Sequence, residues 1–153
     1  MAASRPANVS PSTAPPSRGG GLRTALLVLA GFNLLSCLFG AWGVGAAGPQ
    51  LFGTDLLAGT AFDGLYWVGA LLLGGVVGGT QALALILHLR RSPWTMFGHL
   101  LAGVTMLCWI YGEISVIGGG AWLQHLYFAS GLAQAGLATV LLGAIPVRRR
   151  ATH

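Results

Sequence analysis

Hydrophobic residues along this 153-residue chain gather into four long apolar stretches, separated by short polar or glycine-rich segments. The stretches cover about residues 22–44, 64–89, 94–117 and 121–145. A helix of that length, rising about 1.5 Å per residue, crosses a hydrocarbon core about 30 Å thick. The pattern therefore predicts an all-α membrane protein in which four transmembrane helices form an up-down bundle.

The segments outside these stretches set the expected domain limits. Residues 1–21 are rich in Pro, Ser and Gly and have no apolar face, so we expect a disordered tail. The four-helix transmembrane domain then covers residues 22–147, and residues 148–153 form a basic C-terminus. Only 7% of the residues are charged, against about 25% in ordinary soluble domains. This composition excludes a water-soluble domain of the same size.

The few charged residues predict how the bundle is oriented. All eight basic residues are arginines, and they fall in the three segments that an up-down bundle places on one side, with Arg90 and Arg91 in the middle segment. Asp55 and Asp63 lie in the long connection that faces the other side. The positive-inside rule then places both termini in the cytoplasm of what we expect to be a bacterial inner-membrane protein. Because the arginines flank apolar helices, the net charge of +5 indicates lipid headgroups, and not nucleic acid, as partners.

Glu113 is the only acidic residue inside an apolar stretch. An unpaired carboxylate in a bilayer is costly, so we expect it to be protonated, paired or in contact with water. Glu113 and His125 each lie six residues from Gly119, so an antiparallel hairpin places them at one depth. Two interpretations stay open: a structural hydrogen-bonded pair, or a proton site, cation site or general acid–base pair.

Two further pairs fall at matching depths. His88 and His99 flank the turn around Arg90 almost symmetrically, so they are either candidate haem or metal ligands or histidines at the membrane surface. Cys37 and Cys108 are either small buried hydrophobic residues or a redox pair. The sequence contains none of the common catalytic motifs. We therefore assign no catalytic residue, no metal and no cofactor.

Small residues and amides predict how the helices pack. Residues 74–79 contain two overlapping GxxxG patterns, which allow a close helix crossing. The crossing serves either contacts within the chain or a homo-oligomer. Three amides lie inside apolar stretches, and we expect them to bridge helices by hydrogen bonds: Asn33, Gln81 and Gln134.

Over most of residues 24–143, the chain resembles a set of small uncharacterised bacterial four-helix membrane proteins. The resemblance is carried by Gly31, Asn33 and Gly40, by Leu56–Asp63, by Val76–Gly79 and by Trp122–Phe128. In size and helix count the chain is also similar to DoxX-like membrane proteins. Neither resemblance implies a substrate.

These observations favour a non-enzymatic accessory or assembly subunit of the membrane. The alternative is a small homo-oligomeric transporter or channel, coupled to protons or ions, that uses Glu113. A thiol or haem redox protein is a third interpretation. Four short helices leave little room for a substrate path in one chain, so transport would need several copies. The expected partners are the lipid bilayer and either a second copy or another membrane protein.

Overall fold

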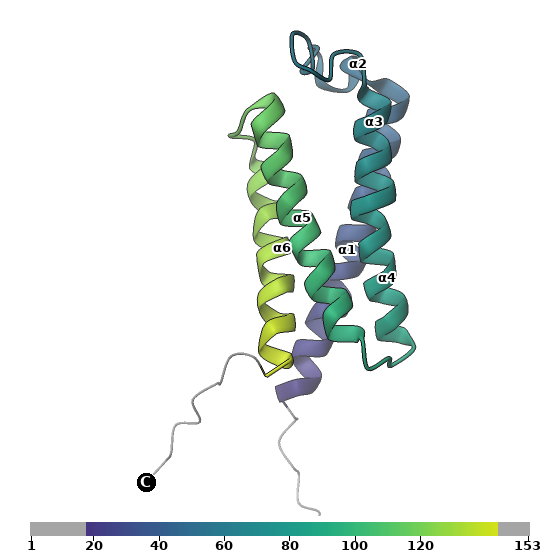
Figure 1. The fold of residues 1–153 in the computed structure, drawn as a ribbon, viewed down its shortest axis with the longest axis vertical. Helices are drawn as coiled ribbons and strands as arrows, with labels where there is room; N and C mark the ends of the chain where they lie inside the picture. Colours follow the sequence, from purple (N-terminus) through teal and green to yellow (C-terminus); the bar gives the residue numbers. More distant parts are fainter. Residues whose placement is uncertain (1–17, 144–153) are drawn as a thin grey trace, which may run out of the picture.

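The structure, a computed structural model, describes residues 18–143, and every regular element in that range is a helix (Figure 1). The elements are α1 (Arg18–Ala47), α2 (Pro49–Phe52), α3 (Tyr66–Leu71), the π-helix η1 (Leu72–Val77), α4 (Gly78–Leu89), α5 (Thr95–Ile117) and α6 (Trp122–Leu141). Because α3, η1 and α4 follow one another without a break, they form one continuous helical rod.

Three helical segments are long and apolar enough to cross a membrane: Gly20–Ala47, Tyr66–Leu89 and Thr95–Ile117. Large hydrophobic side chains lie exposed along them; Leu35 and Phe39, for example, are 70% and 74% exposed. A soluble monomer rarely exposes so many apolar side chains side by side, whereas lipid contact requires them. The chain is therefore a multi-pass membrane protein.

The helix limits lie within about four residues of the predicted stretches, and the larger differences are at the two ends of α1 and at the end of α6, which stops at Leu141. Helix α1 begins at Arg18, so residues 18–21 are helical and do not belong to the expected tail. Residues 1–17 and 144–153, with the rest of the tail and the basic C-terminus, lie outside the described residues.

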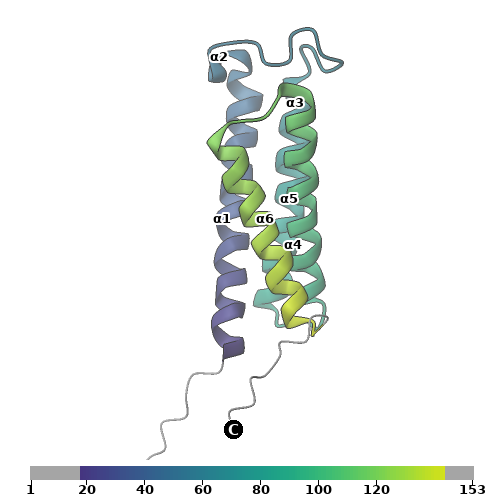
Figure 2. The same ribbon diagram turned by 90° about the vertical axis from the view of Figure 1, so that its left-hand side faces the viewer.

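The long helices form a closed ring of neighbours. Helix α1 packs against the α3–η1–α4 rod, the rod packs against α5 through η1 and α4, and α5 packs along α6. Helix α6 runs obliquely and returns to α1 (Figure 2). The α5–α6 contact is tight because Gly103 and Gly131 face each other; a Cβ atom on Gly103 would lie 2.8 Å from the Gly131 carbonyl oxygen.

Two glycines of the predicted GxxxG patterns serve contacts within the chain. A Cβ atom on Gly74 would lie 2.9 Å from Ala41 Cβ, and one on Gly78 would lie 3.4 Å from Cys37 Cβ, so both allow α1 to approach. Gly75 and Gly79 belong to the second pattern, and a Cβ on either would meet nothing within 4 Å. One pattern therefore packs the bundle, and the other lies on its outer surface.

The two ends of the bundle differ. At one end, here called the arginine-turn end, residues 90–94 join α4 to α5. At the other, the glycine-turn end, lie residues 48–65 and the turn Gly118–Gly120 (Figure 1). A small apolar cluster that includes Val77, Met106 and Ile110 separates the two halves.

Candidate functional site

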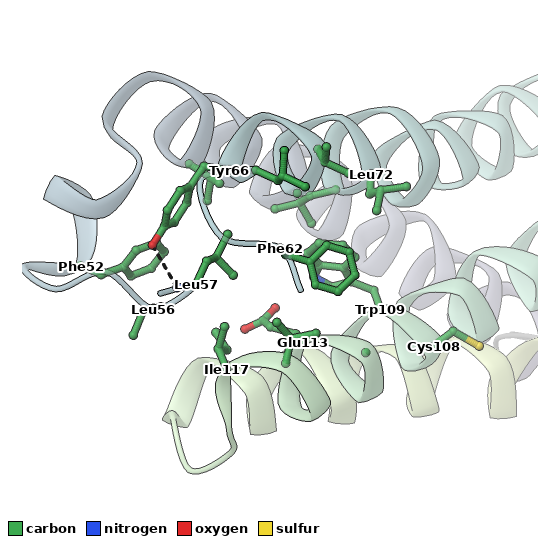
Figure 3. Close-up of a pocket in the computed structure, with 17 residues that line it drawn as sticks. Phe52, Leu56, Leu57, Phe62, Tyr66, Leu72, Cys108, Trp109, Glu113 and Ile117 are labelled. Carbon is green, nitrogen blue, oxygen red and sulfur yellow. Dashed lines mark hydrogen bonds between the residues drawn. The ribbon is translucent and has the colours of Figure 1, made fainter. Parts of the chain in front are cut away.

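An apolar cavity of about 350 Å³ lies at the glycine-turn end, between the α3 side of the bundle and α5 (Figure 3). Its walls come from the end of α1, the connection before α3, the α3–η1 rod and the last turns of α5. The lining residues are Val44, Phe52, Leu56, Leu57, Phe62, Leu65, Tyr66, Val68, Gly69, Leu72, Leu73, Cys108, Trp109, Gly112, Glu113, Val116 and Ile117.

The cavity exists because the α3–η1–α4 rod keeps contact with α5 over only part of its length. Helix α5 contacts α4 and η1 but not α3. The π-helix η1, Leu72–Val77, stands at the point where that contact ends. Single π-turns inside α-helices occur frequently at functional sites, because the wider turn shifts the side chains that follow it. Here it separates a packed half of the rod from a half that faces the cavity.

Of the residues that the structure describes, Glu113 is the only charged one that lines this cavity, and its carboxylate projects from α5 into it (Figure 3). Gln124 of α6 donates a hydrogen bond from Nε2 to Glu113 Oε1 at 3.2 Å. The same nitrogen donates to the Gly118 carbonyl oxygen at 3.1 Å, while Gln124 Oε1 accepts from Ala121 N–H at 3.3 Å. One buried amide thus closes the glycine turn and holds one edge of the carboxylate.

The sequence places His125 at the depth of Glu113, but among the described residues no hydrogen bond joins the two. His125 is exposed, and its neighbour Gln124 is the buried residue that reaches Glu113. Gln124 lies at the third position of α6, where a side chain commonly turns back to cap the helix start. A glutamine at the third position of a helix was the sequence feature that indicated this contact. Counting residues on either side of Gly119 gave only the depth and missed it.

The connection before α3 is held over the cavity by Tyr66. Its hydroxyl donates to Asp55 Oδ1 at 2.7 Å, and the Leu57 backbone N–H donates to the same carboxylate at 3.1 Å. The Leu57 N–H also lies 3.4 Å from the Tyr66 hydroxyl oxygen (Figure 3). Asp63 Oδ2 accepts from the Gly59 N–H at 3.4 Å. Both acidic residues of the connection therefore order its backbone.

A second group of polar residues is buried in the half toward the arginine-turn end. Asn33 of α1, Gln81 of α4 and Gln134 of α6 are fully buried. Asn33 Nδ2 donates to Gln134 Oε1 at 3.2 Å, and Gln134 Nε2 donates to Gln81 Oε1 at 3.0 Å. The predicted bridging by these amides is confirmed. Ser130 adds a bond from its hydroxyl to Asn33 Oδ1 at 3.0 Å.

His99 extends this amide network to His88. Gln134 Nε2 lies 3.3 Å from His99 Nδ1, and His99 Nε2 lies 2.8 Å from His88 Nδ1. The two rings meet nearly edge to face, with centroids 5.0 Å apart. The sequence set these histidines at one depth as candidate ligands, and they meet as a direct hydrogen-bonded pair. Since these two nitrogens share a proton in this bond, ligation of one metal ion by both would require the bond to break and the rings to turn.

A backbone carbonyl fixes the direction of every bond in this network. Gln81 Nε2 donates to the Ala102 oxygen at 3.3 Å, so Gln81 Oε1 must face Gln134. Gln134 then presents its NH₂ group to His99 Nδ1, which accepts. The neutral His99 ring therefore carries its proton on Nε2 and donates to His88 Nδ1.

The remaining sequence candidates occupy separate places. Cys37 is buried against α4, Cys108 lines the cavity, and both thiols are free. Among residues 18–143, no group of three or more His, Cys, Asp or Glu side chains is placed to hold a metal ion. The arrangement thus offers a binding cavity with one acidic group at one end and a closed polar network toward the other.

No protein-family model matches the chain, and neither a curated protein nor a solved structure matches it.

Proposed function

We propose that this protein binds a small amphiphilic molecule within the membrane, in the cavity at the glycine-turn end, and that the molecule carries an amine or hydroxyl group on an apolar body. The observation that carries the proposal is Glu113 projecting into a cavity that is otherwise almost wholly apolar. This function agrees with the transporter interpretation of the sequence more closely than with a purely structural accessory role.

The chemistry of the lining selects the ligand. A cavity of about 350 Å³ falls within the usual size of small-molecule sites. Gln124 bonds one carboxylate oxygen of Glu113, and a carboxylate accepts further hydrogen bonds through its remaining lone pairs. In an apolar surrounding that capacity favours a donor, above all a charged amine. Trp109 adds an aromatic side chain of the kind that attracts organic cations.

The proposal is tested by three probes that share a dodecyl chain and differ in the head: dodecylamine, dodecanol and dodecanoate. Binding to the full chain in lipid nanodiscs is measured by competition with a brominated dodecyl probe that quenches tryptophan fluorescence. We expect the amine to bind most tightly and the dodecanoate most weakly, because Glu113 repels a second carboxylate. Trp109→Phe identifies the part of the quenching that comes from the cavity.

Matched variants assign the effect to the carboxylate. Glu113→Gln keeps the shape of the side chain and removes the charge, so the affinity for dodecylamine falls about tenfold while that for dodecanol changes little. Ser115→Ala is the control, since Ser115 lies on the same helix, is exposed and bonds only to the Tyr111 carbonyl. Equal affinities of all three probes for the wild type and for Glu113→Gln would refute the proposal.

We also propose that α6 is a fourth membrane-spanning helix and that both termini lie in the cytoplasm. Helix α6 has 20 residues, enough for about 30 Å, and the arginines support the orientation. In a variant without Cys37 and Cys108, new cysteines at Thr54, Ser92 and Gly143 report each side with a membrane-impermeant maleimide. The Thr54 cysteine should react in intact cells, and the other two only after permeabilisation. If the Gly143 cysteine reacted in intact cells, as the Thr54 cysteine should, α6 would not cross the membrane.

The accessory or assembly role remains a second candidate because Gly75 and Gly79 lie on the outer surface of the rod with nothing near them. Small residues there would let another helix approach closely. Cross-linking through a cysteine at Gly79 is the test. A disulfide-linked dimer supports self-association, a link to another membrane protein supports an assembly role, and a chain that stays unlinked contradicts both.

A further inference from the structure

A second hollow, of about 440 Å³, lies at the arginine-turn end, far along the bundle from Glu113. Helix α1 contributes Arg23, the end of α4 contributes His88, and the turn and the start of α5 contribute the rest. The lining residues are Arg23, His88, Arg91, Ser92, Pro93, Thr95 and Met96. Two arginines thus share one hollow, and none of its lining residues within 18–143 is acidic.

The buried polar network gives this hollow an oriented donor. Because His88 Nδ1 accepts the bond from His99 Nε2, the proton of the neutral His88 ring is on Nε2. That nitrogen has no hydrogen-bond partner within the described residues, and no buried side-chain nitrogen or oxygen there lacks one. His88 Nε2–H is therefore accessible, on a ring that lines the hollow. The Ala102 carbonyl, four hydrogen bonds away, determines which nitrogen of His88 donates.

Ser92 and Arg91 add donors to the same hollow. The Ser92 hydroxyl oxygen accepts from Trp94 N–H at 3.2 Å, which leaves its own proton free to donate. Arg91 is the one non-glycine residue of the described range with a positive φ, 52°, and its N–H bonds to the His88 carbonyl at 3.0 Å. The turn thus fixes the Arg91 backbone directly beside His88.

We propose that this hollow binds a phosphate ester, with Arg23 and Arg91 pairing with its negative oxygens and the His88 Nε2–H donating to it. Guanidinium groups match the oxygens of phosphate in paired hydrogen bonds, and neutral N–H and O–H donors complete such sites. The volume of about 440 Å³ exceeds the needs of a bare phosphate ion and suits a phosphate carried on a small polar group.

A lipid headgroup and a soluble phosphate ester share this chemistry, and the position of the hollow favours the lipid. It lies where the helix Tyr66–Leu89 ends and the helix Thr95–Ile117 begins. This is the level of the headgroups when those helices span a bilayer. Anionic headgroups are attracted to arginines at such a level. A lipid and a soluble ester are expected to give different binding results.

The test uses the full chain in detergent micelles. Native mass spectrometry counts the phosphatidylglycerol molecules retained, with phosphatidylcholine as the comparison lipid, and phosphorus NMR follows binding of glycerol 1-phosphate and inorganic phosphate. We expect one phosphatidylglycerol to be retained more strongly than phosphatidylcholine and to be displaced by glycerol 1-phosphate. Binding of glycerol 1-phosphate with no retained lipid would assign the site to soluble phosphate esters. Binding of neither would overturn the proposal.

Variants of the turn distinguish this site from general positive charge. Arg91→Gly removes one guanidinium and suits the positive φ, so the turn should form as well as before while phosphatidylglycerol affinity falls about tenfold. Arg90→Gln is the matched control, because Arg90 is the exposed neighbour in the same turn and does not line the hollow. If Arg90→Gln and Arg91→Gly weaken binding equally, diffuse surface charge accounts for it and the proposed site is wrong.

Discussion

The two halves of this bundle use polar side chains in opposite ways. Toward the arginine-turn end, Asn33, Gln81, His99 and Gln134 are fully buried and all their hydrogen bonds are made inside the protein. Toward the glycine-turn end, Glu113 stands in an apolar cavity and is bonded by Gln124 alone among the described side chains. A satisfied network holds helices together, whereas a carboxylate with spare lone pairs is available to a ligand. The comparison separates the buried network that joins the helices from the cavity in which we propose that an amphiphile binds.

The largest expected difference between the two halves comes from replacing one glycine of α5 in each half by alanine. In Gly103→Ala the new Cβ atom would lie 2.7 Å from the Ala135 backbone nitrogen and 2.8 Å from the Gly131 oxygen, so α5 and α6 must separate. We expect the free energy of unfolding to fall by about 2–3 kcal/mol. In Gly112→Ala, in the half that faces the cavity, nothing lies within 4 Å, and stability should stay equal or rise slightly. Thermal unfolding in one detergent compares the two variants. If both lost the same stability, the two halves would be packed alike.

Removing the central amide tests whether the polar network stabilises the bundle. Gln134→Leu leaves Asn33 Nδ2, Gln81 Oε1 and His99 Nδ1 without this partner. We expect a loss of about 2 kcal/mol, because buried groups without partners are costly even where single membrane hydrogen bonds are weak. Thr139→Ala on the same helix is the control, since Thr139 bonds only to the Ala135 carbonyl of its own helix. If Gln134→Leu unfolds at the same denaturant concentration as the wild type, the network contributes no stability.

The smallest expected effect concerns the connection over the cavity. Tyr66→Phe removes the hydroxyl that bonds to Asp55 but keeps the ring in the cavity wall. We expect the free energy of unfolding to change by about 1 kcal/mol or less, and amide hydrogen exchange across residues 53–65 to become faster. Phe52→Leu, which alters the wall without touching this bond, should leave the exchange unchanged. If amide exchange across residues 53–65 stayed as slow in Tyr66→Phe as in the wild type, Asp55 and Asp63 would order the connection without Tyr66.

Much of the fold could be predicted from the sequence, because a bilayer permits few backbone structures. Apolar length predicted the helices to within a few residues, and a buried amide such as Gln81 or Gln134 must find a partner on another helix. The cavity was not predictable, because it depends on where the α3–η1–α4 rod stops contacting α5. Counting residues from Gly119 gave the depth of Glu113 but not the direction of its neighbours. Gln124, and not His125, therefore emerged as the partner only from the helix cap.

The π-helix η1 has a consequence for the helical phase of the rod. A π-turn holds one more residue than the α-turn it replaces, and in an α-helix each residue turns the side chains by about 100°. The orientation of Tyr66 and the cavity wall relative to Gln81 therefore depends on one residue of offset within Leu72–Val77. Restoring a regular α-helix there by deleting a single residue would rotate the wall away from Glu113 and leave the amide network in place. A change of one residue would thus remove the proposed amphiphile cavity and leave the packing of the other half as it is.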